Sequence, residues 1–446
     1  MKIRDRALNI CSRLLHGGKV LVNDFLQSEL VVYFNKTQIN GLRPGQPMFF
    51  LYSPSRAHLF EEPTRFLDEE FVRNGRSPSV HTWLAAGEAL KSWFQWLQAI
   101  KKDWSDATGQ DRLAYRDAYL ISISPRTGQQ YEPSTIASRM RIVRQYYRFA
   151  QHHGWYSGDL ASGVAGDETR LKIPISQDAM VHTERGSRRK PIDRDLPKPR
   201  PKIVIHPLQL TELKALINHC GPQAGHRNGD MRPARDRLFV DLGWMVGLRV
   251  DEIRELTTLQ FLNLHPESDA PLVSHPLEII GKGRKTRQVA IPGWLVEDAI
   301  AYINGERTEA LTMGGISSRT AKTTLFLSGA ESSRPGRPIS KRRLQQIMEQ
   351  ACISVGLTKT MEFINPETQE KYYRVRQKHS VHDLRHTAAV LLYHAERLAG
   401  NAEPWTKVSK QLGHDLVQTT IKIYLQHVEI FGEKQRLTDV RKMIGI

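Results

Sequence analysis

The chain contains little cysteine and has no long run of apolar residues. Its three cysteines, Cys11, Cys220 and Cys352, are too few and too scattered for a disulfide framework or a C-x-x-C metal site, which indicates a reducing compartment. No apolar run approaches membrane-spanning length, and the start of the sequence contains no uninterrupted signal-peptide core. We therefore expect a cytoplasmic protein that has no membrane partner.

The sequence also contains fewer acidic than basic residues. The sequence has 64 Lys and Arg residues against 47 Asp and Glu residues, which leaves a formal net charge of +17 at pH 7. A chain this basic is expected to bind polyanions with an affinity that falls steeply as salt rises, although a merely soluble basic protein is the alternative. Its 446 residues and its 40% hydrophobic content suffice for two or three domains with ordinary cores.

Reactive residue types gather near the carboxyl end of the chain. His382 and Arg385 are three residues apart, on one face of a predicted helix that Ser380 can cap and that continues into an apolar run. Such spacing places an imidazole and a guanidinium side by side.

A second group of reactive residues follows within the next 40 residues or so. Gly413 is predicted to end a helix just before His414, and Asp415 can cap a further helix that carries Tyr424, the last tyrosine of the chain. A phenolate can attack a phosphodiester, and the charge that develops on phosphorus must be met by fixed donors. Arginine suits this task because its fork bridges two phosphate oxygens and keeps its charge.

The pattern H-x-x-R, then L-G-H, then a tyrosine resembles the carboxy-terminal signature of the tyrosine recombinase, or phage integrase, family. Upstream, residues 247–252 (G-L-R-V-D-E) match the family's G-L-R-x-x-E, and residues 279–287 (I-I-G-K-G-R-K-T-R) resemble its G-K-G hairpin. The resemblance covers roughly residues 65 to 446. It implies that Tyr424 is the nucleophile, that His382 takes up or returns its proton, and that Lys282 protonates the leaving 5′ oxygen. Arg249 and Arg385 would bind the phosphate, and His414 would donate a hydrogen bond to a phosphate oxygen. Glu252 would stabilise the site.

The spacing before Tyr424 departs from the family pattern. Tyr424 lies ten residues after His414, where nine are expected, and one extra helical residue rotates a side chain by roughly 100°. The sequence therefore predicts a bulge, an irregular turn or a shifted helix start near residues 420–423. Tyr393, Tyr372 and Tyr373 remain alternative nucleophiles.

Several alternatives apply to individual residues. His382 and His386 have the spacing of an H-E-x-x-H zinc site, but the glutamate is missing and Arg385 would repel a dication. His386 is therefore interpreted as a packed helical histidine. Arg249 by itself could form a structural ion pair with its acidic neighbours, and Arg284 and Lys285 compete with Lys282 for the role at the hairpin tip.

The rest of the chain divides by composition. Residues 1–62 predict a small α+β accessory module, with a helix at 7–15, a strand at 30–34, a second apolar patch at 48–51, and an open function. Residues 63–165 have strong helical periodicity and predict a SAM-like core-binding bundle. Between residues 184 and 202 there are eight Lys or Arg, three acids and four prolines, so residues 166–202 are predicted to form an extended basic linker.

Basic residues in the bundle and the linker are candidates for DNA contact, or else for a solvated surface and a free hinge. They are Arg139, Arg141, Arg144 and Arg148 of the bundle, and Arg188, Arg189 and Lys190 of the linker. Arg284 and Lys285 of the hairpin extend this list.

Residues 203–446 are predicted to form the catalytic domain. Helices are expected at 211–219 and 235–246, and a hairpin at 277–280 and 286–291. The expected fold is mainly α with a small β-sheet, the bundle and the catalytic domain forming a clamp on DNA. A periodic apolar tail at residues 434–446 is expected to dock either on a neighbouring protomer or on its own domain.

The sequence as a whole predicts a site-specific DNA recombinase that works through a 3′-phosphotyrosyl intermediate and a Holliday junction, without ATP, metal or another cofactor. The resemblance implies double-stranded DNA as partner, dimers and a synaptic tetramer, accessory directionality proteins, and association with the nucleoid. A type IB topoisomerase-like enzyme and a catalytically inactive DNA-binding protein are the alternatives. His382, in place of the lysine associated with topoisomerases, favours the recombinase.

Overall fold

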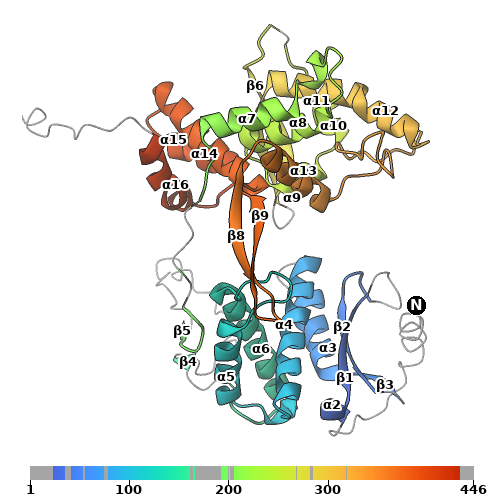
Figure 1. The fold of residues 1–446 in the computed structure, drawn as a ribbon, viewed down its shortest axis with the longest axis vertical. Helices are drawn as coiled ribbons and strands as arrows, with labels where there is room; N and C mark the ends of the chain where they lie inside the picture. The colour runs from blue at the N-terminus through green and yellow to red at the C-terminus, as the bar shows by residue number, and fades with distance from the viewer. Residues whose placement is uncertain are drawn as a thin grey trace, which may run out of the picture. The chain divides into compact units, whose positions relative to one another are not determined.

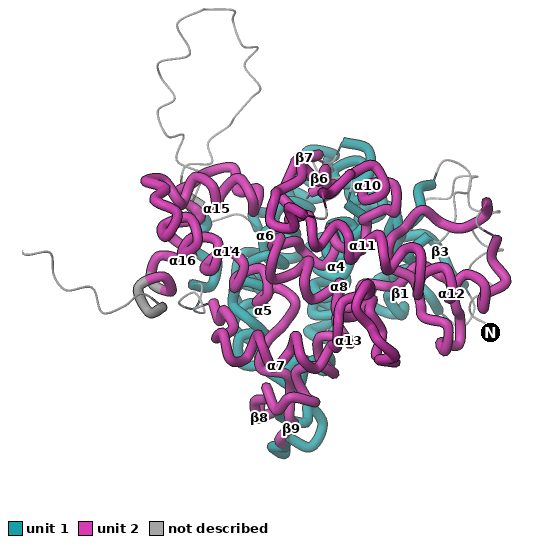
Figure 2. Tube along the Cα trace, turned by 90° about the horizontal axis from the view of Figure 1, so that it is seen from above, with its two compact units in different colours: residues 1–202, 363–372 teal, residues 203–362, 373–446 magenta. Residues whose placement is uncertain are grey.

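The computed structural model describes residues 24–35, 42–53, 56–74, 79–160, 164–165, 192–198, 200, 205–267, 269–281, 285–317 and 319–431. The chain forms two compact units (Figures 1 and 2). Unit 1 comprises residues 1–202 and 363–372, and unit 2 comprises residues 203–362 and 373–446. The predicted helix at 7–15, the basic residues 188–190 and the tail at 434–446 lie outside the described residues.

Unit 1 combines a small antiparallel sheet with a helical bundle. The sheet has three strands in the order β1-β2-β3; the first confirms the strand predicted at 30–34, and the apolar patch at 48–51 lies in the second. The elements of unit 1 are α2 (Asp24–Gln27), β1 (Glu29–Phe34), β2 (Pro47–Tyr52), β3 (Ala57–Leu59), α3 (Glu61–Leu67), η1 (Asp68–Arg73), α4 (Val80–Ala99), η2 (Trp104–Asp106), α5 (Gly109–Ile121), α6 (Pro133–His152), β4 (Val164–Ala165) and β5 (Ile192–Asp193).

The sheet and the bundle share one aromatic core. The ring of Phe94, on α4, lies 5.9 Å from that of Phe49 on β2 and 5.4 Å from that of Tyr146 on α6, both edge-on. All three side chains are fully buried, so each contributes the large apolar area that aromatic residues provide. The sequence separated the first 62 residues from the bundle, but the described strands of that segment pack into the same core as α4 and α6.

Part of the predicted linker folds against the bundle. Arg112, on α5, is fully buried and forms ion pairs with Asp193 and with Asp195, the latter at 3.0 Å. Leu196 packs against the aromatic core. Residues 192–196 of the predicted linker are therefore held against the bundle, because their two aspartates supply the counter-charge of a buried arginine.

Although residues 363–372, at the end of the hairpin of β8 and β9, belong to unit 1, unit 2 is mainly helical and contains the hairpin of β6 and β7 and the remainder of the second hairpin. Together with unit 1 it confirms a mainly α fold with small antiparallel sheets. Its elements are α7 (Leu210–Cys220), η3 (Ala224–His226), α8 (Ala234–Asp241), η4 (Leu242–Val246), α9 (Val250–Glu255), α10 (Thr258–Leu262), β6 (Ser274–Ile280), β7 (Thr286–Pro292), α11 (Gly293–Asn304), α12 (Glu306–Met313), α13 (Lys341–Ser354), β8 (Thr358–Ile364), β9 (Lys371–Gln377), α14 (Val381–Leu398), α15 (Pro404–Leu412) and α16 (Val417–Phe431).

Only one of the two hairpins, that of β6 and β7, was predicted from the sequence. The hairpin of β6 and β7 is the predicted one, with Ile280 paired to Thr286 at its end. The sequence predicted a single small sheet in this domain, so the pair β8 and β9 was missed. Its turn at residues 365–370 carries the N-P-E-T signal of a hairpin, which was available in the sequence.

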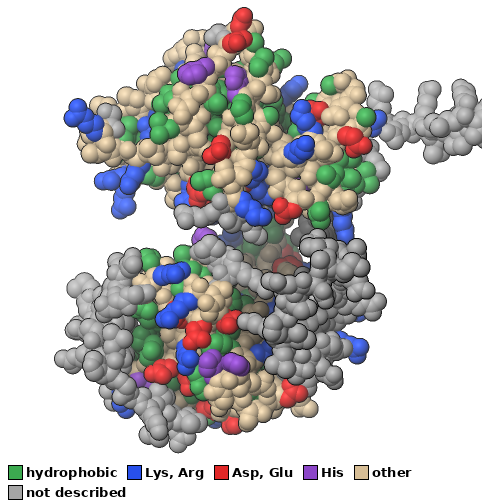
Figure 3. Space-filling view, turned by 180° about the vertical axis from the view of Figure 1, so that it is seen from behind, with side chains coloured by type: hydrophobic (Ala, Val, Ile, Leu, Met, Phe, Trp, Pro, Cys, Tyr) green, Lys and Arg blue, Asp and Glu red, His purple; other side chains and the backbone are tan. Residues whose placement is uncertain are grey.

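Two hydrophobic clusters hold unit 2 together. The larger joins α7, α8, α11, α13 and both strands of the predicted hairpin, and it extends to Leu384 at the start of α14. The smaller lies among α14, α15 and α16 and includes Leu412, Tyr424 and Val428. On the face drawn in Figure 3, Lys and Arg side chains are interspersed with acidic and hydrophobic ones. Among the described residues, none of the helices combines the length and apolar character needed to cross a membrane.

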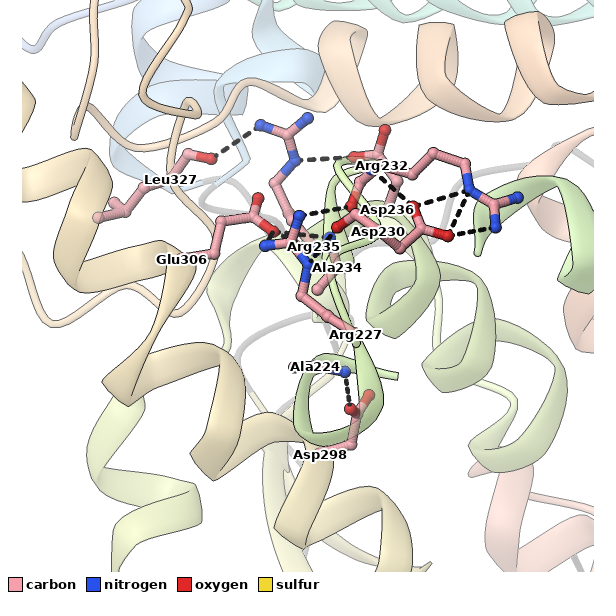
Figure 4. Close-up of polar contacts among 10 residues, drawn as sticks. All are labelled: Ala224, Arg227, Asp230, Arg232, Ala234, Arg235, Asp236, Asp298, Glu306 and Leu327. Carbon is pink, nitrogen blue, oxygen red and sulfur yellow. Dashed lines mark hydrogen bonds and ion pairs between the residues drawn. The ribbon is translucent and has the colours of Figure 1, made fainter. Parts of the chain in front are cut away.

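Buried polar contacts join the start of α8 to the start of α12, and the middle of α11 to η3 (Figure 4). Arg235 is buried and donates to the carbonyl of Leu327 at 3.2 Å, while Glu306 accepts from the backbone N–H of Ala234 at 2.6 Å. On α11, Asp298 Oδ1 accepts from the N–H of Ala224 at 2.5 Å, but its buried Oδ2 lacks a hydrogen-bond partner among the described residues. Burial raises the pKa of Asp298 from 3.8 to about 6.

Replacing Asp298 by Asn should stabilise the protein in alkaline solution. The folded state holds the Asp298 proton up to about pH 6, whereas the unfolded chain releases it near pH 3.8, so the charged carboxylate costs stability above that window. We expect Asp298→Asn to raise the free energy of unfolding by about 1–3 kcal/mol at pH 8 and to change it little at pH 4. Denaturant unfolding at both pH values measures this, with the exposed Asp269→Asn as control; equal effects at the two pH values would contradict it.

Candidate active site

Glu252 is surrounded by three arginines from different parts of unit 2. Arg249 donates to it from its backbone N–H and from Nη1, each at 2.9 Å. Arg287, on β7, donates through Nη1 at 2.7 Å and through Nη2 at 3.1 Å, and Nη1 of Arg385 lies 3.9 Å from Oε2 of Glu252. Glu252 is buried, which by itself raises its pKa, but the bonds from Arg287 and Arg249 outweigh burial and lower it. We call these four residues the Glu252 cluster.

Arg385 is held by backbone carbonyls. It is 1% exposed, and its guanidinium donates to the carbonyl of Gly247 at 2.6 Å and to that of Leu412. Burial and the neighbouring charge of Arg249 lower its pKa to about 10, so it stays protonated at neutral pH. The helix that carries it begins as predicted: Ser380 and Asp383 form a capping box, with the Ser380 N–H donating to the Asp383 carboxylate at 2.7 Å.

Gly413 brings His414 beside the Glu252 cluster. It ends α15 with a φ of +67°, and a Cβ at this position would lie 2.6 Å from the side chain of Arg287, so both the backbone angle and the space require glycine. His414 Nδ1 lies 2.8 Å from Oγ1 of Thr420. Burial and the charges of Arg385, Arg249 and Arg287 lower the pKa of His414 to about 4, so this imidazole is neutral at physiological pH.

Tyr424 lies inside the smaller hydrophobic cluster. It is 1% exposed, and its hydroxyl oxygen lies 2.8 Å from Nδ1 of His386. Burial raises its pKa to about 12, against the opposing charges of Arg385 and Arg249.

The α16 helix is continuous from Val417 to Phe431, so residues 420–423 contain neither the predicted bulge nor an irregular turn. Residues 414–416, between the end of α15 and Val417, lie outside both helices. Asp415 therefore lies two residues before the helix rather than in the capping position.

His382 and His386 have different environments. His382 is exposed, whereas His386 is buried, and their rings pack edge to face at 4.5 Å. Partial desolvation and the charge of Arg385 lower the pKa of His382, and burial lowers that of His386 to about 3. The interpretation of His386 as a packed helical histidine missed its bond to Tyr424.

Arg287 was also missed, although the sequence carries a signal for it. On β7 it shares a face with Val289 and Ile291, which are buried in the larger cluster. A charged residue on the inward face of a strand needs a partner, and that partner is Glu252.

Other predicted site residues lie elsewhere or outside the described residues. Lys282 and Arg284 belong to the undescribed hairpin tip, and Lys285 beside it is exposed. Of the alternative nucleophiles, Tyr393 packs against Trp405 at 4.2 Å between ring centroids. Tyr372 stacks on Phe363 at 5.6 Å, and Tyr373 donates to Glu362 at 3.1 Å.

The four predicted DNA-contact arginines of α6, of which Arg141, Arg144 and Arg148 form one stripe, are partly engaged within unit 1. The guanidinium of Arg139 lies over the ring of Tyr131 at 4.9 Å and donates to Ser92 at 3.1 Å. Arg144 forms an ion pair with Asp193 at 3.3 Å. Arg141 and Arg148 are the exposed members of the stripe.

Comparison with known proteins gives this arrangement a context. The sequence matches the phage integrase family over residues 207–429, half of the 446-residue chain. Tyrosine recombinase XerD of Staphylococcus saprophyticus is 25% identical over 213 residues, 48% of this chain and 55% of that relative. Tyrosine recombinase XerC of Lactobacillus delbrueckii subsp. bulgaricus is 24% identical over 374 residues, 82% of this chain and 96% of that relative. The solved structure of XerH site-specific recombinase bound to a difH substrate is 13% identical and covers 79% of each chain, with a TM-score of 0.47.

Mainly helical unit 2 thus brings Arg249 and Arg385 close enough to His414 and Tyr424 for their charges to act on both. By its sequence match, the chain belongs to the phage integrase family. The match spans about half the length of the XerD relative.

Removing the negative charge of Glu252 should destabilise the protein. Glu252→Gln leaves the positive charges of the Glu252 cluster without their counter-charge in a buried site. We expect the free energy of unfolding to fall by about 3–5 kcal/mol, the usual cost of breaking a buried ion pair. Denaturant unfolding of the free protein measures this.

Glu255→Gln is the matched control. Glu255 lies on the same helix but is exposed, and its ion pair with Arg254 at 2.9 Å should contribute less than about 1 kcal/mol. Sulfate should restore part of the stability of the Glu252 variant alone, because a bound anion replaces the missing charge. Equal stability of the two variants would contradict the role assigned to Glu252.

Proposed function

We propose that this chain is a site-specific DNA recombinase whose nucleophile is Tyr424. The observation that carries this proposal is the placement of a buried tyrosine beside the Glu252 cluster, where the charges of Arg385 and Arg249 favour its phenolate form. Three arginines and one glutamate leave a net positive charge, which suits a phosphodiester and suits even better the more negative transition state of its cleavage.

The reaction conserves the energy of the DNA backbone. The Tyr424 oxygen forms a bond to phosphorus while the bond from phosphorus to the 5′ oxygen breaks, which leaves a 3′-phosphotyrosine and a 5′ hydroxyl. Arg249 and Arg385 hold the phosphate oxygens, His414 donates to one of them, and Lys282 supplies the proton to the leaving oxygen. Attack of a 5′ hydroxyl on the phosphotyrosine reverses these steps, so the reaction needs neither ATP nor a metal.

Recombination, as opposed to relaxation, follows when the attacking hydroxyl belongs to a second duplex. Exchange between two duplexes requires four cleavages, and each protomer supplies one nucleophile. We therefore propose dimers on each site and a tetramer around a Holliday junction, formed in the cytoplasm on nucleoid DNA, with accessory directionality proteins as further partners. A topoisomerase-like activity would reseal the same strand, and an inactive DNA-binding protein would form no adduct.

The basic surface of the bundle is proposed to contact the DNA backbone. Arg141 and Arg148 are the exposed arginines of the α6 stripe. The undescribed linker residues 188–190 and the hairpin residues Arg284 and Lys285 are proposed to add further phosphate contacts, which supply affinity rather than sequence readout.

Changing Tyr424 to Phe should abolish covalent attachment to DNA and leave binding intact. Only one hydroxyl is lost, so DNA affinity should stay close to that of the wild type.

Cleavage should slow by about 10²–10³-fold when Arg249 or Arg385 is replaced by Ala, the usual effect of losing one transition-state donor. A nicked duplex derived from the DNA flanking the gene traps the adduct, and sequencing the linked peptide identifies the nucleophile.

Tyr393→Phe is the control for this experiment, because Tyr393 occupies the same hydrophobic cluster as Tyr424. It should form the adduct at the wild-type rate. Recovery of DNA on a peptide without Tyr424 would overturn the assignment. On supercoiled substrate, relaxation without exchange would instead indicate the topoisomerase.

Neutralising Arg141 and Arg148 together should weaken binding to all DNA sequences. If each contacts one phosphate, the slope of log K against log salt should become less steep by up to about two units. Arg144→Ala is the matched control, because its guanidinium is paired with Asp193 and should change the slope little. Binding isotherms at several salt concentrations measure the slopes; an unchanged slope in the double variant would remove this surface from the DNA interface.

A further inference from the structure

The nucleophile predicted from the sequence has a partner that the sequence motif does not name. The hydroxyl oxygen of Tyr424 lies 2.8 Å from Nδ1 of His386, and the two side chains are 1% and 8% exposed. The partner predicted for this hydroxyl, His382, is instead exposed and packs edge-on against the His386 ring at 4.5 Å. The three rings thus form a row from the buried phenol to the protein surface.

We propose that His386 accepts the Tyr424 proton during DNA cleavage, and that His382 passes this proton to solvent. The inference rests on the proposed function, in which Tyr424 attacks the phosphodiester. The position of His386 next to the Tyr424 hydroxyl supports its role as the base, because a general base must lie within hydrogen-bond reach of the proton that it removes.

Each proton and bond in this step is accounted for. Before attack, the neutral imidazole of His386 accepts from the phenol at Nδ1 and carries its own proton at Nε2. As the Tyr424 oxygen bonds to phosphorus, its O–H bond breaks and a proton joins Nδ1. The imidazolium then releases its Nε2 proton toward His382, and the 5′ oxygen takes a proton from a separate donor.

The charged and titratable groups around His386 determine the conditions under which it can accept this proton. Its own helix supplies His382 and Arg385, the turn before α16 supplies His414, and α16 supplies His427. Burial and these groups lower the pKa of His386 to about 3, which disfavours an imidazolium in the free protein. A bound phosphodiester brings the negative charge that offsets them, so we expect proton acceptance to depend on bound DNA.

The test separates holding the phenol from taking its proton. Asn at position 386 can place an amide oxygen near the position of Nδ1 and keep the hydrogen bond, but it lacks the basicity of imidazole. We expect His386→Asn to bind the nicked duplex normally and to slow adduct formation by about 10²–10⁴ near neutral pH, the range typical of a general base. The deficit should shrink as pH rises toward 10, because ionisation of the phenol then replaces the base.

A fluorinated tyrosine at position 424 provides the second readout. Its phenol has a lower pKa and needs less help from a base, so it should restore much of the rate of His386→Asn while changing the wild-type rate little. A purely structural role for His386 would give no such rescue. His394→Asn, two turns further along α14, is the matched control and should retain wild-type rates and the wild-type pH profile.

The outcomes distinguish this inference from the proposed function. Failure of the wild-type protein to form any adduct would overturn the proposed function itself. If the wild type and His386→Asn form the adduct at rates within about twofold of each other, only the role of His386 is overturned. A twofold difference is far smaller than the usual effect of losing a general base. Slow cleavage without rescue by fluorotyrosine would also overturn it, because it would indicate loss of packing alone.

Discussion

The balance of charge around Glu252 is the constraint on which the rest of the site depends. One buried carboxylate binds Arg249 and Arg287 directly, and Arg385 lies 3.9 Å away. Without it, three guanidinium groups would repel one another in a site that is largely shielded from water. With it, they are held in place but not fully neutralised, so the site is organised for an anion before any anion arrives. The same ion pairs therefore support the stability of the protein and the proposed binding of a phosphate.

Backbone and amide contacts hold this cluster against the helices that carry the histidines and the tyrosine. Gln411, near the end of α15, donates to the carbonyls of Val246 and Ala290 and accepts from the Ala290 N–H. It thus ties α15 to β7 and to the end of η4. The absence of a side chain at Gly413 lets the guanidinium of Arg287 pass between β7 and α15. Residues that are distant in sequence meet here because polar groups of the backbone, and not only side-chain packing, specify the contact.

Local features of the fold were predictable from the sequence, whereas contacts between distant segments were not. The Ser380 capping box, the helix end at Gly413 and the hairpin ending at Ile280 and Thr286 each depend on a few adjacent residues. The partners of Arg287 and His386 depend on tertiary packing, and the ion pair of Asp193 with Arg112 joins residues 81 positions apart. The bulge predicted at residues 420–423 was wrong because a residue count alone does not determine where a helix begins. The roles of the site residues stay predictions.

The burial of Tyr424 also restricts how it can react. With a pKa of about 12, only about one phenol in 10⁵ is ionised at pH 7, and a DNA phosphate placed beside it would raise that pKa further. A preformed phenolate is therefore a poor starting point for attack. In the proposed reaction, the proton would therefore leave as the bond to phosphorus forms, while Arg385 and Arg249 would take up the charge that appears on the phosphate oxygens. A base already hydrogen-bonded to the phenol, as His386 is, meets this requirement, and its low pKa keeps it unprotonated and ready until the phosphate arrives.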